Sequence, residues 1–162
     1  MEKLTQNFIR NICAILEIEP PRISSDVDDF PTDTTLAAVC IPADGGKPFL
    51  CLRENVEPDP GYYVQVAHEL RHLWQLENDN GYWFGSYKSI EELRGDLTRY
   101  NLQPAEVDAH AFSVVVLVRA FGAAPTFETL GEPVRQAIAE RLRQIAPEVD
   151  EAGARWMNSR DK

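Results

Sequence analysis

The sequence predicts an α+β fold in a single domain spanning residues 1–162, and three observations support this. Apolar residues recur at helical spacing near the N-terminus and in three segments after residue 60. Two short apolar runs around a glycine-rich turn lie between these regions. Because the strand-like runs are grouped instead of alternating with helices, a doubly wound parallel sheet is not expected. A length of 162 residues also suits one domain.

The N-terminal segment, residues 3–17, is expected to form an amphipathic helix. Its apolar side chains fall on one helical face: Leu4, Phe8, Ile9, Ile12, Ile15 and Leu16. The consecutive prolines Pro20 and Pro21 then prevent the helix from continuing.

A small sheet of two to three strands is expected next. The runs TLAAVCI (35–41) and PFLCLRE (48–54) flank ADGGK, and two extended runs around a two-glycine turn predict a hairpin. Residues 22–24 are a further candidate strand. The chain has three cysteines without a C-x-x-C spacing, so we expect reduced core residues, with Cys40 facing Cys51 across the hairpin.

Three helices are expected in the second half of the chain. Residues 62–78 lack proline and glycine, residues 105–121 are apolar nearly all round, and residues 131–147 form a last amphipathic segment. Between the first two, residues 79–100 are irregular and rich in aromatic side chains. This segment is either a lid or a packed loop with a short helix at 89–97, begun by a capping box of Ser89 and Glu92.

Composition and charge exclude several classes of protein. A formal net charge of −10 makes nucleic acid a poor partner, because phosphates repel an acidic chain. No apolar run is long enough to span a membrane. The first twenty residues do not resemble a signal peptide, so a cytoplasmic location is expected.

The segment His68-Glu69-Leu70-Arg71-His72 has the form H-E-x-x-H. On a helix, positions i and i+4 project the same way, so the two imidazoles can converge on one zinc ion. Glu69 is rotated from His68 by about 100° and can act as general base on a zinc-bound water. The alternative is an ordinary solvated helix face. Apolar neighbours such as Val66 and Leu70 favour the metal site, because embedded histidines need partners.

A third metal ligand is expected from PAEVDAHAFS, residues 104–113. Glu106 and His110 share a helix face there, with Ala109 between them, whereas Asp108 is rotated from Glu106 by about 200°. We assign Glu106 as ligand and give His110 a catalytic role beside it, as a hydrogen-bond donor to a ligand or to an oxyanion. A site of His68, His72 and His110 competes with this assignment. In the non-functional alternative, His110 is a core histidine, and Glu106 is an acid near the helix N-terminus, where the helix dipole favours a negative charge.

HELRH followed by E-x-x-A-x-x-F resembles the gluzincin metallopeptidases, particularly the small ImmA/IrrE-type group. The resemblance covers about residues 35–120 and implies a zincin-like fold, in which a buried glutamate helix follows the H-E-x-x-H helix. It implies that His68, His72 and Glu106 bind zinc and that Glu69 is the catalytic base. It also implies that the strand before the active helix, residues 48–53, lines the cleft and pairs with the substrate backbone. The family usually has Asn or Asp where His110 stands.

The function expected from the sequence is that of a zinc metallopeptidase with one Zn2+ per chain. Its substrate is expected to be a protein or peptide, and an endopeptidase is favoured over an exopeptidase. Candidate oxyanion donors are His110, Arg71, Tyr82 and Tyr87, although for Arg71 a position facing solvent or an acidic partner is favoured. Aromatic residues expected to wall the cleft are Trp74, Trp83 and Phe84. Two rival hypotheses remain: an inactive zinc-binding or partner-binding module with a peptidase-like fold, and a metal-free adaptor whose acidic face engages a basic partner.

Overall fold

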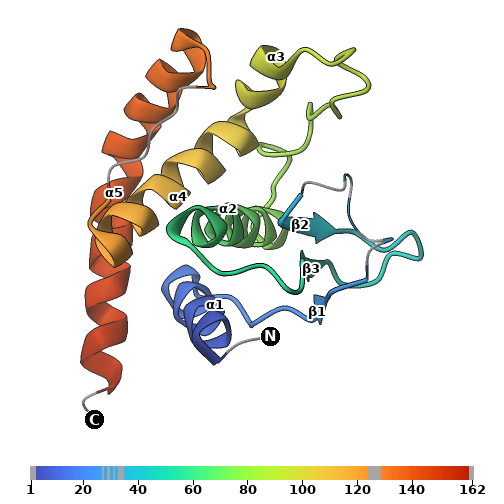
Figure 1. Ribbon diagram of the computed structural model, residues 1–162. Helices are drawn as coiled ribbons and strands as arrows, with labels where there is room; N and C mark the ends of the chain where they lie inside the picture. Colours follow the sequence, from blue (N-terminus) through green and yellow to red (C-terminus); the bar gives the residue numbers. More distant parts are fainter. Residues whose placement is uncertain are drawn as a thin grey trace.

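The computed structural model describes residues 3–26, 28, 30, 32, 35–123 and 129–160 (Figure 1). Within these residues it has five helices and one three-stranded sheet, which confirms the α+β class. The elements in chain order are α1 (Lys3–Leu16), β1 (Ile23–Ser24), β2 (Ala37–Cys40), β3 (Phe49–Leu52), α2 (Pro60–Glu77), α3 (Leu97–Asn101), α4 (Pro104–Phe121) and α5 (Glu132–Arg160). No helix of this described part is long and apolar enough to cross a membrane.

The sheet confirms the predicted hairpin and the third strand, in the order β1-β3-β2. Strand β2 runs antiparallel to β3, and β1 runs parallel to β3 on its other side. The prediction about the cysteines was wrong: Cys40 lies opposite Phe49, and Cys51 lies opposite Ala38. None of the three cysteines forms a disulfide bond in the structure.

Strand β3 is therefore the central strand, which overturns one expectation. Residues 48–53 cannot pair with a substrate, because β1 and β2 occupy both edges of β3. Residues 48–53 directly precede the H-E-x-x-H helix among the strands of the sequence, but in the sheet they form the middle strand. The outer strand on the side of α2 is β2.

Helix α2 lies at the centre of the fold, against α1, α4 and the sheet (Figure 1). It starts at Pro60, and the side chain of Asp59 accepts a hydrogen bond from the Tyr62 N–H at 2.7 Å. Aspartate before a first-turn proline is a favoured helix start. Val66, Ala67 and Leu70 have no exposed surface, so this helix forms the middle of the core.

Helix α4 crosses α2 and is buried along most of its length, as its apolar pattern predicted. It ends at Gly122, whose φ of 64° lies in the left-handed region that glycine adopts without strain.

Helix α5 is longer than expected, because it continues through Pro147 to Arg160. Proline removes one backbone donor, but tertiary contacts offset this loss. The second half of α5 carries ion pairs to other elements, between Asp150 and Arg119 and between Arg155 and Glu17.

The segment between α2 and α4 is a series of turns followed by the short helix α3, and most of its residues are exposed or half-buried. The predicted capping box forms, since the Ser89 N–H donates to Glu92 and the Glu92 N–H donates to the Ser89 hydroxyl. The helical turn that it begins does not extend to residue 97. Arg94 and Gly95 have positive φ values of 55° and 77°, which ends the turn before α3.

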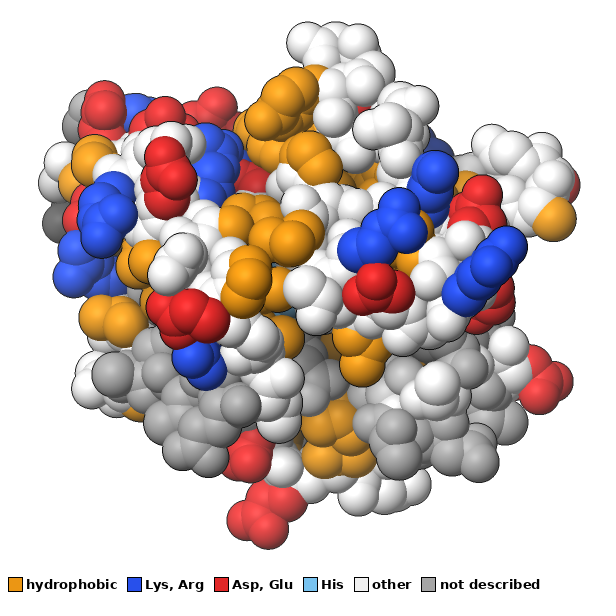
Figure 2. Space-filling model, turned by 90° about the horizontal axis from the view of Figure 1, so that it is seen from above, with side chains coloured by type: hydrophobic (Ala, Val, Ile, Leu, Met, Phe, Trp, Pro, Cys, Tyr) orange, Lys and Arg blue, Asp and Glu red, His pale blue; other side chains and the backbone are white. Residues whose placement is uncertain are grey.

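The surface is mixed in charge on the face seen in Figure 2. Acidic and basic side chains lie close together over its described part, with hydrophobic side chains between them. The described part of this face is therefore not a continuous acidic surface.

Replacing Asp59 by alanine is expected to lower the free energy of unfolding by about 1 kcal/mol, because the α2 N-terminus loses its capping acceptor. Urea denaturation of the purified protein measures this. Glu57→Ala, a nearby exposed change outside the helix, is the control. Equal stability of the Asp59→Ala and Glu57→Ala proteins would contradict the capping role.

Candidate metal centre

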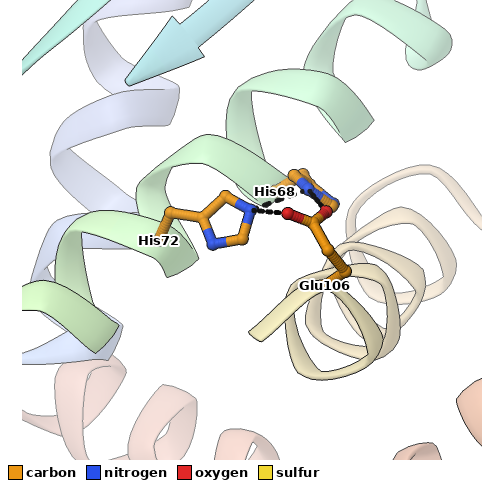
Figure 3. Close-up of side chains that lie close together, drawn as sticks. All are labelled: His68, His72 and Glu106. Carbon is orange, nitrogen blue, oxygen red and sulfur yellow. Dashed lines mark hydrogen bonds and ion pairs between the residues drawn. The ribbon is translucent and has the colours of Figure 1, made fainter. Parts of the chain in front are cut away.

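The structure brings together His68 and His72 of α2 and Glu106 of α4 (Figure 3). The two histidine Nε2 atoms lie 3.0 Å apart. The Glu106 carboxylate faces them, with Oε2 3.3 Å from His68 Nε2 and Oε1 3.5 Å from His72 Nε2. These three residues are a group that could hold a metal ion.

The spacing of these atoms fits a small tetrahedral ion. With zinc–ligand bonds of about 2.0–2.1 Å, neighbouring ligand atoms of a tetrahedron are about 3.3 Å apart. The observed separations of 3.0, 3.3 and 3.5 Å lie around that value. Two imidazoles and one carboxylate are also a donor set that zinc prefers.

Small side chains allow the two helices to approach closely at this point. Ala105 and Ala109 flank Glu106 on α4, and neither has exposed surface. Ala67, on α2 beside His68, is equally buried. Glu106 itself is only 3% exposed, so its carboxylate depends on protein partners for stabilisation.

The charges of the site are strongly coupled. Burial alone would raise the pKa of Glu106, but its hydrogen bonds to His68 and His72 hold that pKa well below the usual value. Burial alone would lower the pKa of His72, but the hydrogen bond and charge of Glu106 outweigh it and raise that pKa to about 9. Without a metal, His72 and Glu106 are therefore a charged pair near neutral pH.

His110 lies beside this group but directs one nitrogen elsewhere. Its ring packs on His68 with 4.5 Å between centroids, and its Nε2 is 3.0 Å from Asn101 Oδ1. Burial lowers the pKa of His110 to about 3, so the imidazole is neutral and its Nε2–H donates to Asn101. This geometry favours Glu106 over His110 as the third ligand.

Glu69 lies on the strand side of the same helix. Its Oε2 accepts a hydrogen bond from the backbone N–H of Val39, on β2, at 2.9 Å. The carboxylate predicted as catalytic base is therefore held between the active helix and the outer strand of the sheet.

A pocket of about 380 Å³ opens onto this group. Its walls are the candidate metal-binding group with Glu69, strand β2, and three aromatic side chains: Phe84, Tyr87 and Tyr100. A larger hollow of about 860 Å³ lies beside the prolines that follow α1, and it shares only Leu76 with this pocket. The smaller pocket is the relevant one, because it contains the ligand cluster.

Two tyrosines extend the polar network. The Tyr87 hydroxyl donates to Glu106 Oε1 at 2.7 Å and lies 2.6 Å from the Tyr100 hydroxyl. Since Tyr87 has one proton, the proton between the two hydroxyls comes from Tyr100. Burial and the charge of Glu106 raise the pKa of both phenols, so both remain neutral donors.

Several residues expected at the cleft lie elsewhere. Arg71 is buried on the far side of α2, where it pairs with Asp108 and lies over the Trp74 ring. Tyr82 is 64% exposed, and Trp83 packs on Tyr82 and Trp74. Helical rotation separates Arg71 and Trp74 from the histidine face, whereas only Phe84 of the expected aromatic residues lines the pocket.

Three features of the site were not predicted from the sequence: Tyr100, Gln75, and the place of β2 as the strand beside the pocket. Tyr100 gave no local signal, because its role depends on the path of residues 79–100. Gln75 did give one, since it is a polar residue one turn after His72 in an apolar helix.

Comparisons of the chain with protein-family models, with curated proteins and with solved structures found no match.

Zinc affinity is expected to rise with pH between 7 and about 9, by about tenfold per pH unit, and to level off above. The reason is that zinc binds the neutral imidazole of His72, whose pKa is raised, so below pH 9 it must displace a proton. Competition with a chromophoric chelator at several pH values measures this. An affinity that does not change over this range would contradict the ion pair between His72 and Glu106.

Proposed function

We propose that the chain is a zinc-dependent metallopeptidase with a zincin-like fold of the gluzincin type, in which His68, His72 and Glu106 hold one zinc ion. The convergence of these side chains beside Glu69 carries the proposal. Three protein ligands leave a fourth position open, which is typical of catalytic zinc sites. When bound, zinc lowers the pKa of a water and polarises a carbonyl oxygen.

Glu69 is the general base in this proposal. Its carboxylate lines the same pocket as the ligands, and the Val39 N–H orients it. An ionised carboxylate accepts up to about four hydrogen bonds, so a bond from Val39 leaves capacity for a water molecule. Glu69 takes the proton of the attacking water and passes it to the leaving amine.

The outer edge of β2 is the proposed binding site for an extended substrate. In an antiparallel pair, backbone groups alternate between facing the partner strand and facing away. The Leu36 carbonyl accepts a hydrogen bond from the backbone N–H of Arg53 and therefore faces the β3 side. The Val39 N–H instead points away from β3, to Glu69. The alternation therefore directs the Ala37 and Val39 carbonyls outward beside the pocket, where they can accept substrate N–H groups.

Tyr87 is the proposed donor to the tetrahedral oxyanion, with Tyr100 behind it. Both line the pocket, and their raised pKa values keep the phenol protons in place. To donate to an oxyanion, Tyr87 exchanges its bond to Glu106 for one to the substrate oxygen. His110 is the weaker candidate for this role, because it is not among the residues that line the pocket.

An inactive zinc module with the same fold is the second candidate function. One observation favours it: the Val39 N–H bond makes Glu69 a bridge between α2 and β2, which is a structural role that needs no chemistry.

Glu69→Gln separates the two candidates. The variant is expected to keep its zinc and its fold but to lose peptidase activity by about 10²–10⁴-fold, because a neutral amide cannot accept the water's proton. Cleavage of a peptide mixture, followed by mass spectrometry, measures activity, and elemental analysis measures zinc.

Glu77→Gln is the matched control, since Glu77 is an exposed residue at the end of the same helix. It is expected to behave as wild type. A zinc-loaded wild type that cleaves no peptide would reject the peptidase in favour of the inactive module. Peptide cleavage that Glu69→Gln leaves undiminished would instead reject Glu69 as the general base.

A further inference from the structure

A buried glutamine lies directly behind the metal-binding face. Gln75 is on α2, one turn after His72, and has no exposed surface. Its Oε1 is 2.7 Å from His72 Nδ1. Its Nε2 lies 3.0 Å from the Ala105 carbonyl oxygen and 2.8 Å from Asp108 Oδ2.

These contacts define the orientation of the Gln75 amide. Both groups near its Nε2 are acceptors, so the NH₂ group must face them and the oxygen must face His72. The His72 Nδ1 then carries a proton and donates it to Gln75. The nitrogen left with a lone pair in the neutral imidazole is Nε2, which faces His68 and Glu106.

Asp108 holds the amide in turn. It is 1% exposed, and its carboxylate also accepts from Arg71 of α2 at 2.7 Å and from Arg141 of α5 at 2.8 Å. Burial alone would raise the pKa of Asp108, but Arg71, Gln75 and Arg141 together lower it, so the carboxylate stays ionised.

We propose that Gln75 and Asp108 are positioning residues for the metal site, acting through His72. The proposal rests on the metal site proposed above. Gln75 selects the tautomer and ring orientation in which His72 presents Nε2, and Asp108 prevents the Gln75 amide from turning over. Arg141 connects α5 to the same hydrogen-bond network, because it donates to Asp108. A metal-binding histidine is thus supported by a chain of hydrogen bonds across three helices.

A purely structural role would also account for buried polar contacts, so the test must separate positioning from stability. Gln75→Met keeps the side-chain length and removes the acceptor. It is expected to weaken zinc binding by about 10–100-fold. Competition with a chromophoric chelator measures the affinity, and the visible absorption of the Co2+-loaded protein reports the coordination geometry, which is expected to change.

A further variant completes the test. Leu73→Ala creates a cavity at a buried position of the same helix without touching the hydrogen bonds, and it is expected to lower the melting temperature but to keep zinc affinity.

The outcomes are distinguishable. A wild type that binds no zinc overturns the proposed function and this inference with it. A zinc-binding wild type, with a Gln75→Met protein of equal affinity and unchanged Co2+ spectrum, overturns only the inference. The inference also fails if Leu73→Ala weakens zinc binding as much as Gln75→Met does, because affinity would then follow stability alone.

Discussion

The buried charge of Glu106 is the constraint on which the rest of the structure depends. A carboxylate that is almost fully removed from water is tolerated only with partners of opposite charge or with hydrogen-bond donors. His68, His72 and Tyr87 supply these donors, and they come from α2 and from the turns that follow it. The contact between α2 and α4 therefore includes a buried polar group as well as apolar surfaces.

Helix α4 carries two carboxylates with different roles. Glu106 faces the open pocket, where its partners are imidazoles that also offer lone pairs to a metal. Asp108 points to the opposite side, where its partners are arginines that cannot give up their charge. Gln75 joins the two sides, because it contacts both Asp108 and His72. The ion pairs of Asp108 with Arg71 and Arg141 thus lie directly behind the group of His68, His72 and Glu106, which could hold a metal ion.

Much of the site could be predicted from the sequence, because helical spacing is a local property. The i, i+4 relation of His68 and His72 and the helix position of Glu106 follow from periodicity alone, and the structure brings the three residues together. The order of the strands could not be predicted in this way. It depends on which strands pair over long range, and the chain order wrongly favoured residues 48–53 over β2 as the strand beside the cleft. Tyr100 was missed for the same reason, since only the folded path of residues 79–100 brings it to the pocket.

The end of α5 also could not be predicted from the local sequence. A proline predicts a helix end from local chemistry, but α5 continues past Pro147, and Val149 beyond the proline packs against the core. Arg71 is the reverse case. The sequence favoured a position facing solvent or an acidic partner over a role in the cleft, and the helical rotation turns Arg71 towards Asp108.

Zinc content in matched variants tests the central claim most directly. Elemental mass spectrometry would be applied to purified wild type, Glu106→Ala and His110→Ala. A site made by His68, His72 and Glu106 predicts about one zinc per chain in the wild type and in His110→Ala, and a loss of zinc in Glu106→Ala. Loss of zinc in His110→Ala but not in Glu106→Ala, or a folded wild type that takes up no zinc when it is supplied, would contradict the account.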